Sequence, residues 1–275
     1  MASKSIREGF VNSPHAVLGL GMFCLLLLSG CGSKEESAGE TSSSWSEAAT
    51  AAPVIDAATA ATVTGRVVFD GTPPAMQVID LSSEEVCHHS AEASPVYTEN
   101  VVINDNGTLR NAFVYVKEGL GNREFPVPQE PVVIDQKGCR YEPHVIGIQT
   151  KQPLLIKNSD EGVLHNIHAI SKAGNRFNFG MPKIMETTKQ FKKAEVMVKI
   201  KCDVHGWMSS YAGVVDHPYF AVTGEDGSFS LSPLPPGDYV IEVWHEEYGT
   251  QMQQVSVAQQ ETKDVTFTFG DSGTQ

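Results

Sequence analysis

Short runs of β-branched and aromatic residues recur along the chain after about residue 60, separated by Gly, Pro, Asn and Asp. Such runs, with turn residues at short intervals, are typical of strands in β-sandwiches. We expect strands at 62–69, 101–103, 111–116, 132–134, 154–156, 196–200, 220–223, 228–231, 239–244 and 265–269. No long helical period occurs, and only 183–194 is ambiguous. The pattern predicts an all-β fold.

Two turns near the C-terminus identify one module. The run Thr223-Gly224-Glu225-Asp226-Gly227-Ser228-Phe229 predicts a strand, a tight Asp-Gly turn and a second strand. The run Leu234-Pro235-Pro236-Gly237-Asp238-Tyr239 predicts a corner fixed by proline, with a glycine free to take positive φ. Together these runs resemble the carboxypeptidase regulatory-like (transthyretin-like) family, which implies a β-sandwich.

The strands that open this family's fold lie far upstream in the chain. Gly65-Arg66-Val67 and 111–116 have the expected form, and both lie far upstream of Thr223. One alternative is a discontinuous regulatory-like sandwich, with its first part at 61–119 and the remainder at 217–270, interrupted by a second domain at 120–216. The other is two consecutive domains that divide near Asp216.

The segment between these parts carries metal-binding residue types. Cys202, His205 and Met208 follow one another at a spacing of three residues, and His165 lies upstream. If Cys202 ends a strand, His205 and Met208 lie on the loop after it, and His165 comes from a different strand. Two imidazoles, one thiolate and a weak axial thioether are the ligands of a mononuclear blue-copper electron-transfer centre.

The same residues resemble the cupredoxin family. The spacing C-x-x-H-x-x-M matches amicyanin, Asn158-Ser159-Asp160 before His165-Asn166 resembles the segment that leads to the first His ligand, and Cys139-Arg140-Tyr141-Glu142-Pro143 resembles the usual aromatic-x-Pro entry. The resemblance implies a Greek-key sandwich, copper as cofactor, and four ligands. It also implies that Asn166 ties the two ligand loops together. The four ligands that the resemblance implies are His165, Cys202, His205 and Met208.

One feature departs from the family. Many cupredoxins have Pro between the Cys and His ligands, whereas this chain has Asp203 and Val204. A carboxylate beside the thiolate is expected to stabilise the oxidised metal and lower the potential. A degenerate fold, with Cys202 as a small buried apolar residue and Met208 in the core, is the structural alternative.

Other donors near these residues have structural interpretations as well as functional ones. His168 and His144 could join the metal site, but an exposed or hydrogen-bonded role is the more common one. Met181 and Met185 could form a copper entry patch or fill the core. His88 and His89 are expected at the surface, and His217 and His245 in structural or packing contacts.

The N-terminus has the pattern of an export signal. Lys4 and Arg7 precede an apolar run at 16–28 and then small residues, and Leu28-Ser29-Gly30-Cys31 resembles a bacterial lipobox. We expect a lipoprotein signal peptide at 1–31, with Cys31 acylated and the lipid bilayer as its partner. An ordinary signal with an incidental Cys is the alternative. Gly32 favours the outer membrane over the inner, and residues 32–60, rich in Ser, Glu, Ala and Thr, predict a disordered linker.

Charge and cysteine usage narrow the choice of partners. The formal net charge of −13 argues against nucleic acid and suits a basic redox protein. Cys87, Cys139 and Cys202 remain after the signal and lipid cysteines, and an odd number in an oxidising compartment needs an explanation. A Cys87–Cys139 disulfide with Cys202 kept as a metal thiolate is economical. Three free cysteines, or another pair, stay open.

No enzyme motif is present: the chain lacks G-x-S-x-G, H-E-x-x-H and a phosphate-binding loop. We therefore expect no enzymatic activity. The sequence predicts an exported, lipid-anchored mononuclear copper protein that transfers one electron at the cell envelope. The alternatives are a non-catalytic envelope binding or scaffold protein with a degenerate cupredoxin fold, and a periplasmic copper carrier.

Overall fold

The computed structural model describes residues 56–91 and 95–270. The predicted signal peptide, Cys31 and most of the predicted linker lie outside these residues, as does the side chain of His89. Within the described part of the chain, no helix is both long enough and apolar enough to span a bilayer.

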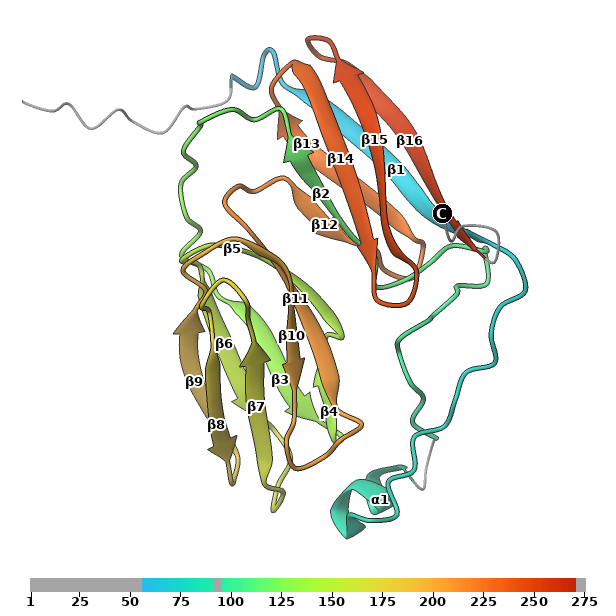
Figure 1. The fold of residues 1–275 in the computed structure, drawn as a ribbon, viewed down its shortest axis with the longest axis vertical. Coiled ribbons are helices and arrows are strands. Elements are labelled where there is room, and N and C mark those ends of the chain that lie inside the picture. Colours follow the sequence, from blue (N-terminus) through green and yellow to red (C-terminus); the bar gives the residue numbers. More distant parts are fainter. Residues whose placement is uncertain (1–55, 92–94, 271–275) are drawn as a thin grey trace, which may run out of the picture. The chain divides into compact units, whose positions relative to one another are not determined.

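Two sheets form one β-sandwich, called sandwich A here (Figure 1). One sheet has the order β13-β1-β16, with bounds Ser228–Leu234, Ala61–Asp70 and Thr262–Gly270. The other has the order β12-β2-β14-β15, with bounds Phe220–Val222, Phe113–Glu118, Gly237–His245 and Gly249–Val257. Alternate residues point inward because successive side chains on a strand face opposite sides. Val63, Val67, Ile241 and Phe267 are among the members of its core.

Two further sheets form sandwich B. One has the order β5-β11-β10-β7-β8, with bounds Val145–Gln149, Ser209–Val215, Glu195–Lys201, His165–Ile170 and Phe177–Met181. The other has the order β4-β3-β6-β9, with bounds Arg140–Glu142, Val132–Lys137, Pro153–Asn158 and Met185–Gln190. Its core includes Ile134, Ile156, Ile167 and Ile200.

The chain enters sandwich B after β2 and returns to sandwich A at β12. Strand β1 pairs with β13 and with β16, and β2 pairs with β12 and with β14, so strands from both ends of the described chain share sheets. This pairing favours the discontinuous arrangement over two consecutive domains. The boundaries at 119/120 and 216/217 stay predictions.

Several elements differ from the sequence expectations. Residues 101–103 form only an isolated bridge, Ile103 with Leu109, and not a strand. The ambiguous segment 183–194 contains strand β9. A short helix, α1 (Glu85–Ala91), was not expected, because seven residues are too few to show a helical period. Six further strands were also missed: β4, β5, β7, β8, β11 and β15. Strands β4 and β5 are short, and polar residues break the run of apolar ones in the other four.

Candidate metal centre

The four predicted ligands lie at one end of sandwich B. Strand β7 begins at His165, and β10 ends at Lys201, one residue before Cys202. The two strands pair antiparallel, with His168 opposite Lys201. The first residue of β7 and the loop after β10 therefore meet at the same end of the sheet. Residues 202–208 form that loop, and β11 begins directly after it.

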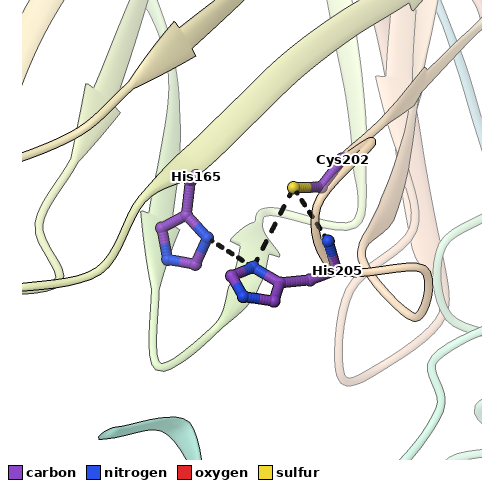
Figure 2. Close-up of side chains that lie close together, drawn as sticks. All are labelled: His165, Cys202 and His205. Atoms are coloured by element: carbon purple, nitrogen blue, oxygen red, sulfur yellow. Dashed lines mark hydrogen bonds between the residues drawn. The ribbon is translucent and has the colours of Figure 1, made fainter. Parts of the chain in front are cut away.

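Three atoms that could bind a metal face one another at this end of the sheet (Figure 2). His165 Nδ1 lies 3.0 Å from His205 Nδ1, and Cys202 Sγ lies 3.9 Å from the same His205 atom. The three side chains together offer donor atoms that all lie within 4.8 Å of one another. All the predicted ligands are buried, with exposed fractions of 0% for His165, 3% for Cys202, 3% for His205 and 2% for Met208.

These spacings can be compared with those of a bound ion. With metal–nitrogen bonds of about 2.0 Å, a metal–sulfur bond of about 2.3 Å and trigonal angles, the nitrogens lie roughly 3.5 Å apart and nitrogen and sulfur about 3.7 Å apart. The observed separations of 3.0 and 3.9 Å differ from these by half an ångström or less. With the third pair, Cys202 and His165, also within the 4.8 Å limit of the group, the three side chains fit a single small ion after small shifts.

The loop that carries three of the donors is closed by its own backbone. Cys202 N donates to Met208 O at 3.2 Å, and Met208 N donates to His205 O at 3.0 Å. His205 N also donates to Cys202 Sγ at 3.3 Å. Met208 and Cys202 belong to the same core cluster of sandwich B. Hydrogen bonds within residues 202–208 thus hold this loop in one conformation.

Asp160 orients the other donor, His165. Its carboxylate accepts hydrogen bonds from Gly138 N at 2.7 Å, Cys139 N at 2.9 Å and His165 Nε2 at 2.8 Å. A hydrogen on Nε2 leaves Nδ1 with a free lone pair, which faces Cys202 and His205. A carboxylate behind a metal-binding imidazole fixes its tautomer and raises its basicity. Asp160 stands in the Asn158-Ser159-Asp160 run of the sequence, but no spacing pattern predicts this contact.

Asn166 joins the two ligand-bearing segments, as the resemblance implied. Its Oδ1 accepts a hydrogen bond from Asp203 N at 2.9 Å, directly after Cys202. Its backbone oxygen accepts from the hydroxyl of Tyr141, a residue 1% exposed. These contacts tie the start of β7 to the loop after β10.

Asp203 does not face the thiolate as an isolated negative charge. Its carboxylate contacts Lys201 at 2.8 Å, His168 at 3.0 Å and Asn178 at 3.0 Å. Hydrogen bonds from Lys201 and His168 lower its pKa to about 2. These three partners offset its charge, so the expected effect on the metal potential is weaker than an unpaired acid would give.

A disulfide lies beside the centre. Cys87 and Cys139 are bonded to each other, and Cys202 is the free cysteine among the described residues. Cys139 O accepts a hydrogen bond from Trp207 Nε1 at 2.9 Å, and the Trp207 ring lies 5.0 Å from the His205 ring. The backbone of Cys139 therefore contacts both Asp160, which holds the His165 ring, and Trp207, which lies against the His205 ring.

The site lowers the pKa of its thiol. Burial raises the pKa of Cys202, but hydrogen bonding to His165 and to backbone amides outweighs burial and brings that pKa below its usual value. For His165, burial lowers the pKa, and the Asp160 carboxylate more than reverses this. A thiolate rather than a thiol is the metal-binding form of cysteine.

The other candidate donors have partners elsewhere. His168 pairs with Asp203, and His144 Nε2 contacts Glu246 Oε2 at 2.7 Å. Met181 is fully buried and its sulfur accepts from Gln136 Nε2 at 2.9 Å. Met185 packs against the core of sandwich B. Neither His168 nor His144 belongs to the group formed by His165, Cys202 and His205 among the described residues.

Comparisons with known proteins address the two sandwiches separately. The model of the carboxypeptidase regulatory-like domain matches residues 213–270, which include the two turns that carry this resemblance in the sequence. No curated protein matches the chain. The family match covers part of sandwich A, and the all-β architecture agrees with it.

Several solved structures are similar to part of this chain. A copper-containing nitrite reductase from Thermus scotoductus is 17% identical over 36% of this chain, with a TM-score of 0.31, and the match spans only 25% of that enzyme. A reduced mutant of amicyanin is 20% identical over 32% of this chain and 85% of its own, with a TM-score of 0.28. A purple cupredoxin from Nitrosopumilus maritimus is 21% identical over 30% of this chain and 97% of its own, with a TM-score of 0.26. These likenesses are partial, and the case for a metal rests on the donor geometry.

Proposed function

We propose that this protein holds one copper ion between His165, Cys202, His205 and Met208 and transfers one electron at the cell envelope. The observation that supports the proposal most directly is the convergence of two imidazole nitrogens and one thiol sulfur within 4.8 Å of one another, all buried. This N₂S donor set, with a buried methionine on the same loop, has the composition of a blue-copper site.

Copper bound by two imidazoles and a thiolate supplies one-electron redox chemistry. The protein's residues divide the remaining work. Asp160 holds the ring of His165, and the backbone bonds of residues 202–208 hold the loop. Because β-strands and hydrogen-bonded turns anchor all the donors, the ligands move little when the charge at the centre changes, which keeps the reorganisation energy low.

The burial of the four side chains also argues against an open coordination position for a substrate. Electron transfer therefore suits the site better than catalysis, and no enzymatic activity is proposed. The predicted lipidation of Cys31 would anchor the protein to a bacterial membrane, with the outer membrane favoured by Gly32. The predicted linker at 32–60 would separate the lipid from the folded part, and a basic redox protein would suit its acidic charge.

Titration of the purified apo-protein with Cu(II) tests the proposal. The expected result is uptake of one equivalent and an intense visible thiolate-to-copper band. Cys202→Ser should abolish this band, whereas His168→Gln, which removes a neighbouring imidazole outside the donor group, should leave it in place.

Two other outcomes would favour the alternatives. Stoichiometric binding of Cu(I), with no coloured Cu(II) form, would favour a copper carrier. Absence of stoichiometric copper uptake, with a folded apo-protein, would favour a scaffold or binding protein.

A further inference from the structure

The outer nitrogen of His205 is buried and has no hydrogen-bond acceptor. His205 Nδ1 faces His165 and Cys202, so Nε2 points away from the three donors (Figure 2). The residue is 3% exposed, and Nε2 lacks a hydrogen-bond partner among residues 56–91 and 95–270. The Oε2 atom of Glu84 lies 3.6 Å from Nε2. That separation is an ion-pair contact but is too long for a hydrogen bond.

The two imidazoles of the centre are therefore supported unequally. The outer nitrogen of His165 has a carboxylate acceptor at 2.8 Å, whereas the outer nitrogen of His205 has a carboxylate 3.6 Å away. If Nδ1 of His205 binds a metal, the neutral ring carries its hydrogen on Nε2. A buried N–H without an acceptor is unfavourable, and a shift of less than an ångström by the Glu84 side chain would supply one.

Glu84 belongs to a segment that packs over the centre, Ile79–His88, here called the cover. Within it, Glu84 N donates to Leu81 O at 3.1 Å, and Glu84 O accepts from His88 N at 2.9 Å, so the backbone at Glu84 is held at both polar groups. Leu81, Cys87, Cys139 and Val163 form one buried cluster, against which Trp207 packs. The cover thus shares its packing with the residue that lies against the His205 ring.

The cover is fastened by a covalent bond. Cys87 lies at the start of α1, three residues after Glu84, and is bonded to Cys139 of sandwich B. Along the chain the cover is joined to β1 and β2 by long connections, since neither 71–79 nor the described part of 95–112 contains a named strand. The disulfide, together with the packing of Leu81 against Cys139 and Val163, therefore places Glu84 beside His205.

We propose that Glu84 is a positioning residue of the metal centre: its carboxylate accepts the Nε2–H of His205, and the Cys87–Cys139 disulfide holds the cover that presents it. This inference rests on the proposed function, because it takes His205 Nδ1 as a metal donor. A negative carboxylate next to one imidazole also stabilises the more positive oxidised ion relative to the reduced one.

The test compares the full-length protein with Glu84→Ala, Glu84→Gln and, as a matched loss of charge at an exposed site of sandwich B, Glu186→Gln. Glu84→Ala should lower the ratio of Cu(II) to Cu(I) affinity by about tenfold, as measured by the reduction potential. Glu84→Gln keeps an amide oxygen as acceptor and should lower the ratio less. Glu186→Gln should leave it unchanged.

Two readouts do not depend on the potential. Imidazole ¹⁵N NMR of the apo-protein should show that Glu84→Ala reduces the fraction of His205 with its hydrogen on Nε2, whereas Glu186→Gln does not. In the apo double variant Cys87→Ser/Cys139→Ser, mass spectrometry should detect faster alkylation of Cys202, because the cover is no longer tied down. An unchanged tautomer fraction and an unchanged potential in Glu84→Ala would overturn the assignment of Glu84.

Failure of this inference can be told apart from failure of the proposed function. If the wild-type protein gains no thiolate-to-copper band, the proposed function fails, and the apo NMR and alkylation experiments still decide whether Glu84 and the disulfide position His205. If the wild-type band forms and Glu84→Ala matches Glu186→Gln in every measurement, only the role of Glu84 is refuted.

Discussion

Replacement of Asp160 tests whether the structure has the support of the centre right. The carboxylate of Asp160 accepts three hydrogen bonds, from Gly138 N, Cys139 N and His165 Nε2, at 2.7 to 2.9 Å. Its side chain is 13% exposed, so water can reach only part of it. Asp160→Ala therefore leaves three donors without their acceptor, while Asp160→Asn keeps one acceptor oxygen and places an N–H₂ group against a donor.

A hydrogen bond to a charged group contributes about 1.5–3 kcal/mol, and water can replace some of the lost bonds. We expect Asp160→Ala to lower the free energy of unfolding of the apo-protein by about 3–5 kcal/mol, and Asp160→Asn by about 2 kcal/mol. Loss of a partner behind a metal-binding imidazole should also weaken copper binding by roughly 10–100-fold.

Urea denaturation followed by tryptophan fluorescence measures the first quantity, and competition with a copper chelator measures the second. Glu186→Gln, an exposed acid on β9, serves as the control and should change neither. If Asp160→Ala unfolded at the same urea concentration as the wild type and kept its copper affinity, the hydrogen bonds assigned to Asp160 would not be supporting His165.

Three further predictions address other parts of the fold. Removal of the Cys87–Cys139 disulfide, which closes a loop of sequence separation 52, should lower the free energy of unfolding by about 4 kcal/mol on the chain-entropy model, as measured by denaturation of Cys87→Ser/Cys139→Ser. Gly213→Ala places a methyl group where Phe113 Cζ lies 2.4 Å away, and such overpacking should cost about 1–3 kcal/mol in the same assay, whereas Gly206→Ala, which meets no atom within 4 Å, should be nearly neutral. Burial lowers the pKa of His245 to about 4. Between about pH 6.5 and pH 4 the unfolded chain therefore binds a proton at this residue that the folded chain does not, so the free energy of unfolding should fall by about 3 kcal/mol as the pH drops through this range. A pH profile in which His245→Gln loses as much stability over this range as the wild type would contradict this.

Four residues could be predicted as metal ligands because such residue types are few in this chain and lie in recognisable positions, and the structure brings three of them together. Cys202, His205 and Met208 have a fixed spacing, and His165 follows an Asn-Ser-Asp run, so their convergence could be expected from strand ends alone. The same pattern could not reveal what supports the donors. The contact of Asp160 with Gly138 and Cys139 depends on how β4 and β6 lie in space, and no spacing in the sequence connects Glu84 with His205.

The fold class was predictable for a similar reason, and the individual elements less so. Apolar alternation marks β1, β6 and β10, which are buried on one face. Strands β9 and β15 consist mostly of polar residues. Their composition does not mark them as strands, and they are recognised only by their pairing with a neighbouring strand. The interruption of sandwich A by sandwich B was one of two open alternatives, because strand pairing between residues 200 apart leaves no local trace.

X-ray absorption at the copper edge of the loaded protein tests the central claim most directly. We expect one sulfur and two imidazole nitrogens among the nearest neighbours of the copper, with the sulfur lost in Cys202→Ser. A spectrum with only nitrogen and oxygen neighbours in the wild-type protein would contradict the assignment of Cys202, His165 and His205 as a common copper site.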